Sequence, residues 1–168
     1  KRPGRWVAEA DWPAAHIEYR AYPLAPGRQL QSPGSKVEKS TFSIQSPLSV
    51  GLFASKWCSY QATPDLPHDQ REEDGGSLIF DTPPLKTSLE IMGAPRVELT
   101  FSSNKPNGML AVRISDVAPD DKATRVTYGL LNLTHREGSN RPSPLKPHQK
   151  YHVSIDLNGI AQKFPRGH

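Results

Sequence analysis

The chain has 168 residues and a mass of 18.6 kDa, the size of one domain with a modest hydrophobic core. Its 17 prolines are about twice the usual share, so few stretches are long enough for an uninterrupted helix. No apolar run of about 18 residues is present to cross a membrane. The composition therefore excludes a helical bundle, and it predicts an all-β domain with no membrane partner.

The net charge of +4 and the pI near 9.3 do not identify a nucleic-acid partner. Such a partner needs basic residues gathered on one face, whereas the 21 lysines and arginines here are interleaved with acids. The densest basic group, Lys1, Arg2 and Arg5, lies at one end of the sequence. We therefore predict a solvated surface of mixed charge and no nucleic-acid binding.

Alternation of apolar and polar residues predicts strands along most of the chain. The clearest segments are residues 17–22, before a Pro26–Gly27 turn, and residues 97–101, 110–114, 126–133 and 151–157. Weaker segments are residues 42–45, 50–53, 77–80 and 89–92. The alternation slips at Gly129, where we predict a β-bulge.

Short strands without intervening helices favour an antiparallel β-sandwich or jelly roll over a parallel α/β sheet. We predict a single domain over residues 1–168. Residues 1–48 would be an irregular wrapping segment with one or two strands, and residues 49–168 would form the main sandwich.

The sequence contains little that indicates catalysis. The GxSxG motif of an α/β-hydrolase nucleophile is absent, so no catalytic residue is assigned within this chain. The lone Cys58, beside Trp57, excludes an internal disulfide and a cysteine-based zinc site, and a packing role is favoured over a nucleophilic one. We predict no metal and no cofactor.

Two acidic groups allow other readings. Asp116, Asp120 and Asp121 could hold calcium, but without EF-hand spacing a turn with solvated acids is favoured. The polar run at residues 69–74 could make inter-domain hydrogen bonds, but the run taken alone favours an exposed loop.

Several stretches, taken in order, resemble a known family. The chain is similar to the C-terminal non-catalytic domain of the X-Pro dipeptidyl-peptidase and cocaine-esterase-like serine hydrolases, from about Trp12 to the last residue. The stretches that carry this resemblance are residues 69–71 (DQR), 77–80 (SLIF), 82–85 (TPPL), 90–95 (EIMGAP), 110–120 (LAVRISDVAPD), 125–129 (RVTYG), 131–136 (LNLTHR), 145–147 (LKP) and 164–168 (FPRGH).

The resemblance implies a jelly-roll β-sandwich of the galactose-binding-like kind, here lacking its last strand. It also implies an upstream α/β-hydrolase domain, absent from this chain, that carries the Ser-Asp-His triad and cleaves ester or amide bonds. That catalytic domain of the same polypeptide would be the partner, and contacts between copies in a homo-oligomer remain open. We expect an accessory domain in a cytoplasmic hydrolase; whether the substrate is an ester, an amide or an X-Pro peptide stays open.

The resemblance further implies that a loop of this domain forms part of the wall of the substrate pocket. We place that loop at residues 51–60, with Phe53, Trp57, Cys58 and Tyr60 as its candidate residues, because aromatic side chains give large contact areas. Ordinary packing of Trp57 is the competing interpretation. Trp12–Pro13 is the candidate inter-domain contact.

An alternative from a different class of function is an independent carbohydrate-binding β-sandwich. Such a module would stack sugar rings on exposed aromatic side chains.

Overall fold

The computed structural model describes residues 4–55 and 67–168 of the chain. In this part of the chain no helix is long and apolar enough to cross a membrane. The only helical elements described are two short 3₁₀ turns, and all pairs of named strands are antiparallel. The all-β prediction is therefore confirmed. The elements are β1 (Leu24–Ala25), β2 (Gln29–Leu30), η1 (Gln70–Gly76), β3 (Leu89–Gly93), β4 (Arg96–Phe101), β5 (Met109–Val117), β6 (Ala123–Asn132), η2 (Leu133–His135), β7 (Tyr151–Asp156) and β8 (Ile160–Phe164).

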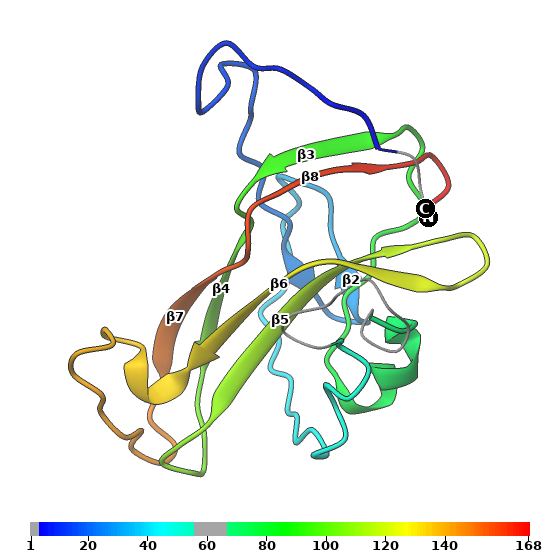
Figure 1. Ribbon diagram of the computed structural model, residues 1–168. Coiled ribbons are helices and arrows are strands. Elements are labelled where there is room, and N and C mark those ends of the chain that lie inside the picture. The colour runs from blue at the N-terminus through cyan, green and yellow to red at the C-terminus, as the bar shows by residue number, and fades with distance from the viewer. Residues whose placement is uncertain (1–3, 56–66) are drawn as a thin grey trace.

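A long, bent two-stranded ribbon forms the frame of the fold (Figure 1). Strand β3 pairs with β8 and β4 pairs with β7, so β3–β4 and β7–β8 run side by side in opposite directions. The bend lies between the two ladders, where the Leu157 N–H donates to the Pro95 carbonyl at 2.8 Å. Proline has no N–H to give to a ladder, so its position at the interruption follows from its chemistry.

The second frame element is the β5–β6 hairpin, whose strand β6 crosses the ribbon at this bend. Two hydrogen bonds tie the elements together: the Thr127 hydroxyl donates to the Asn158 carbonyl at 2.8 Å, and the Asn158 N–H donates to the Tyr128 carbonyl at 3.0 Å. Gly129 follows Tyr128 on β6, and a Cβ built there would be 2.4 Å from the Asp156 carbonyl oxygen. The absence of a side chain at Gly129 is therefore what lets β6 approach the ribbon.

The predicted bulge at Gly129 is wrong in its position. Gly129 pairs in register with Val112, and the ladder shifts instead between Ile114 and Ser115, which face Thr127 and Arg125. Val126 is thus the extra residue. The glycine is needed because another backbone approaches closely. In a sequence, a strand glycine of this kind looks the same as one that marks a bulge.

The buried apolar core is small; most of its residues belong to β6, β7 and the segments that flank them, and two alanines come from β1 and the chain before it. In the described residues its members are Ala14, Ala25, Ala123, Leu133, Leu145, Val153, Ile155 and Leu157. The alternating residues of β4 are only half-buried on their apolar face. Strand β7 alternates between buried and exposed, as its sequence predicts.

The strand predictions at residues 89–92, 97–101, 110–114, 126–133 and 151–157 are confirmed by β3, β4, β5, β6 and β7, although Leu133 belongs to η2 and Leu157 lies just after the end of β7. Those at residues 17–22, 42–45, 50–53 and 77–80 are wrong, because no strand forms there. Tyr19, for example, is 94% exposed and has no neighbouring strand to pair with. The Pro26–Gly27 turn is present, but it joins the very short β1 and β2.

Candidate functional site

A cluster of polar side chains lies where η1 meets the β5–β6 hairpin. Its centre is Glu73, whose side chain is only 2% exposed and forms an ion pair with Arg113 on β5. The other carboxylate oxygen accepts the backbone N–H of Gly51 at 2.6 Å and that of Phe53 at 3.1 Å. Arg113 also donates to the Gln70 amide oxygen at 2.7 Å. One buried charge thus joins η1, β5 and the chain before residue 54.

The environment of Glu73 keeps its carboxylate charged. Burial raises the pKa of Glu73, but the hydrogen bonds from the Phe53 N–H, from Arg113 and from the Gly51 N–H lower it by more, so the pKa lies below its ordinary value. A buried carboxylate with these partners is a structural acceptor and not a general acid, because it does not hold a proton at neutral pH.

Asp69 attaches the start of η1 to the hairpin. Its Oδ1 accepts the Ala123 N–H at 2.9 Å and the Arg71 N–H at 3.1 Å, and these hydrogen bonds lower the pKa of Asp69 below its ordinary value. Arg71 donates to Asp74 at 2.9 Å, which raises the pKa of Arg71. The run at residues 69–74 is therefore an ordered 3₁₀ turn with Gln70 and Glu73 buried, and the favoured reading of an exposed loop is wrong.

The structure places only part of the predicted pocket wall. Phe53 is half-buried, and its ring centroid lies 5.4 Å from that of His68. Trp57, Cys58 and Tyr60 lie outside the described residues. The sequence did not indicate the contacts of Phe53 with η1, because their partners are up to 20 residues away.

The inter-domain candidates Trp12 and Pro13 are both exposed, with Trp12 at 68%, and the peptide bond between them is cis. They belong to the irregular segment that leads into β1. Their side chains are accessible to a partner surface.

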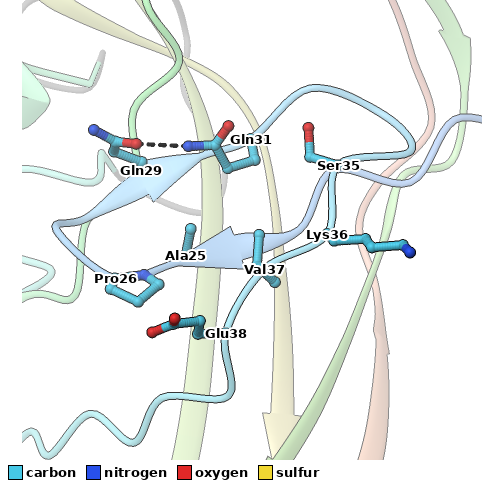
Figure 2. A pocket seen from close by; sticks show the side chains of 8 residues that line it. All are labelled: Ala25, Pro26, Gln29, Gln31, Ser35, Lys36, Val37 and Glu38. Carbon is cyan, nitrogen blue, oxygen red and sulfur yellow. Dashed lines mark hydrogen bonds between the residues drawn. The ribbon is translucent and has the colours of Figure 1, made fainter.

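One cavity is an open groove of about 500 Å³ between the β1–β2 hairpin and residues 35–38 (Figure 2). Gln29 and Gln31 line it, and the Gln31 Nε2 donates a hydrogen bond to the Gln29 Oε1 at 2.6 Å. None of its eight lining residues is aromatic, so the groove offers no platform for stacking a sugar ring. A smaller depression of about 180 Å³ lies beside His68, between Pro67 and residues 122–125.

Asp116 is a second buried carboxylate, at 1% exposure. Its Oδ1 lies 2.8 Å from Nδ1 of His168, whose carbonyl accepts the Leu85 N–H at 2.7 Å. The prediction of a solvated acid is therefore wrong for Asp116, which lies within β5, whereas Asp120 and Asp121 are exposed in the turn that follows. Within residues 4–55 and 67–168, no group of three or more histidine, cysteine, aspartate or glutamate side chains could hold a metal ion.

Comparison with known proteins agrees with this all-β architecture. The family model of the X-Pro dipeptidyl-peptidase C-terminal non-catalytic domain matches residues 1–168. The chain is 23% identical to cocaine esterase of Rhodococcus sp. (strain MB1 Bresler), with 97% of this chain and 30% of the esterase covered. It is 21% identical to the Xaa-Pro dipeptidyl-peptidase of Pediococcus pentosaceus, with 99% and 26% covered.

Solved structures show the same fold. The crystal structure of an aminopeptidase from a marine sediment archaeon (Thaumarchaeota) superposes with a TM-score of 0.82 at 21% identity, covering 98% of this chain and 30% of that one. An α-amino acid ester hydrolase matches with a TM-score of 0.57 at 30% identity, over 60% of this chain and 18% of that one.

These features define a non-catalytic accessory β domain of hydrolytic enzymes. The chain belongs to the X-Pro dipeptidyl-peptidase C-terminal domain family. It spans less than a third of the length of these relatives.

Proposed function

We propose that this chain packs on the catalytic α/β-hydrolase domain of its own polypeptide, and that residues 51–60 contribute to the wall of the substrate pocket. The observation that carries the first part is the exposed area. The chain exposes 12876 Å², whereas a compact monomer of its mass exposes about 8,200 Å². The excess is larger than the roughly 800 Å² that each partner buries in a standard interface.

The exposed apolar side chains support the same partner. Trp6, Trp12, Tyr19, Leu48 and Leu52 are all at least two-thirds exposed, and all lie in the irregular chain before residue 54. Large apolar side chains are mostly buried on average, so five this exposed in one stretch of chain favour an interaction surface. The relatives are more than three times as long as this chain, so a further domain of the polypeptide is the natural cover.

The pocket role is supported by Phe53. This side chain keeps partial exposure while the backbone on both sides of it is fixed by Glu73 and Gln70. A half-exposed aromatic residue on fixed backbone is suited to an apolar substrate contact, because little entropy is lost on binding.

Hydrogen exchange measured on this chain and on the full polypeptide tests the packing. We expect amides of residues 5–21 and 48–53 to exchange more slowly in the full polypeptide, and those around Leu130, an exposed apolar residue of β6, to stay unchanged. Equal exchange in both proteins would refute the packing. Slower exchange only on adding mono- or oligosaccharides would favour the carbohydrate-binding alternative.

A further inference from the structure

Phe53 and His68, 15 positions apart in the sequence, lie in contact beside the start of η1. The His68 N–H donates to the Phe53 carbonyl at 3.1 Å, and the two rings are in contact. Phe53 and His68 thus form a neck, which joins the described chain on the two sides of residues 56–66. Closing a loop of this length costs entropy, so the neck needs further contacts to stay closed.

The amide of Gln70 binds both sides of the neck. Its Nε2 donates to the Phe53 carbonyl at 3.1 Å and to the His68 carbonyl at 2.9 Å. Glu73 binds the incoming side, through the N–H groups of Gly51 and Phe53. Gln70 and Glu73 are three residues apart on η1, so both face the neck.

Arg113 orients these two side chains from β5. A single nitrogen, Nη1, donates to the Gln70 amide oxygen and to the Glu73 carboxylate. The first contact fixes the Gln70 amide with its NH₂ toward the two backbone carbonyls. The second neutralises the buried Glu73 charge, which would otherwise be costly to keep.

Contacts outside the neck tie it to the rest of the fold. Arg125 of β6 donates to the Ala54 carbonyl, and its guanidinium lies 4.8 Å from the centre of the Tyr128 ring. The incoming chain also packs on the end of η1, where the Ser46 hydroxyl donates to the Gly76 carbonyl at 2.7 Å. The neck is therefore fixed relative to the β5–β6 hairpin.

We propose that Gln70, Glu73 and Arg113 form a clamp that fixes the neck, and that they are positioning residues for substrate binding by the hydrolase. The inference rests on the pocket role proposed above. The clamp uses side chains where a strand ladder would use backbone, so both sides of the neck are held at η1 without a sheet between them. Substrate-contacting groups gain affinity from being held in place before binding.

The test variant is Arg113→Gln, with Arg96→Gln as the matched control. Arg96 is also an arginine on a strand and is paired to one carboxylate, Asp156, but its ion pair is exposed. Amide exchange is measured on the 168-residue chain, and kcat and KM are measured on the full polypeptide with a chromogenic ester and an X-Pro substrate.

For Arg113→Gln we expect the Gly51, Phe53 and His68 amides to exchange about tenfold faster or more, as for loss of a hydrogen bond to a charged group. The Val153 and Ile155 amides of the core should not change. KM should rise severalfold with little change in kcat, and Arg113→Lys should restore part of the effect, because one nitrogen makes both contacts.

Failure of the clamp and failure of the proposed pocket role give different results. Unchanged exchange at the neck overturns the clamp, whatever the kinetics show. Faster exchange with a KM equal to that of Arg96→Gln refutes the pocket role, and with it the claim that the clamp positions substrate-binding groups. If Arg113→Gln also loses protection at Val153, the test is repeated with Gln70→Ala, which keeps the Glu73–Arg113 pair. Exchange of the His68 amide and the KM are then judged by the same criteria.

Discussion

Gly129→Ala tests the joint that holds the β5–β6 hairpin against the bent ribbon. The new Cβ would lie 2.4 Å from the Asp156 carbonyl oxygen, 3.1 Å from its carbon and 3.2 Å from the Leu157 Cα. All three are backbone atoms and cannot rotate away. Overpacking of this kind costs about 1–3 kcal/mol, and contact with backbone favours the upper end.

A smaller effect acts in the opposite direction. Gly129 does not have a positive φ, so alanine can adopt its backbone conformation and gains about 0.4–1 kcal/mol from the unfolded state. The expected net loss is about 2 kcal/mol, which for a chain of this length lowers Tm by about 4–8 °C.

Thermal and urea unfolding of the 168-residue chain, followed by circular dichroism, measure this loss. Gly75→Ala is the matched control, because a Cβ there meets nothing within 4 Å and its φ is not positive. A Gly129→Ala protein as stable as the Gly75→Ala protein would refute the reasoning, since β6 would then not depend on this close approach.

Three further predictions concern charge, docking and activity. Because the pKa of Glu73 is lowered on folding, its stabilising contribution is present above its ordinary pKa and is lost as pH falls through the folded value. The stability difference between wild type and Glu73→Gln, from urea unfolding, should therefore shrink between pH 7 and pH 3; a constant difference would contradict this. In the full polypeptide, Trp12→Ala should lower Tm by more than Leu130→Ala, and equal shifts would remove Trp12 from the interface. The 168-residue chain alone should release no chromophore from ester or X-Pro substrates above background, and saturable hydrolysis would overturn its non-catalytic role.

Strand prediction succeeded where a partner strand lies alongside and one face of the pair turns toward the core. The alternation at residues 97–101 and 151–157 became the antiparallel pair β4–β7, with one face turned toward the core. The equally clear alternation at residues 17–22 formed no strand, since no edge lies beside it to complete the hydrogen bonds. Strand β8 was missed because a five-residue segment containing Gln162 has a weak pattern, and its partner β3 lies about 70 residues earlier.

The site was less predictable than the strands. An acid-rich run is normally a solvated surface, so the sequence favoured an exposed loop at residues 69–74. The spacing of Gln70 and Glu73 does place both on one side of a helical turn, and that signal was present. Their burial depends on Arg113, 40 residues from Glu73, and no local pattern indicates that pairing.

The contacts of the first 55 residues bear on the proposed packing against a catalytic domain. Within residues 4–55, attachment to the frame comes mainly from Arg5 to Glu90, from the β1–β2 hairpin to Asp81, and from residues 46–55 to η1, His68 and Arg125. Trp6, Trp12 and Tyr19 lie between the first two attachments and are exposed. A segment held at few points, with its large aromatic groups in water, would gain stability from a surface that buries those groups. The same segment leads into the neck at Phe53, so docking of the catalytic domain on it would also act on the predicted pocket wall. The proposed packing and the proposed pocket role would thus depend on the same continuous stretch of chain.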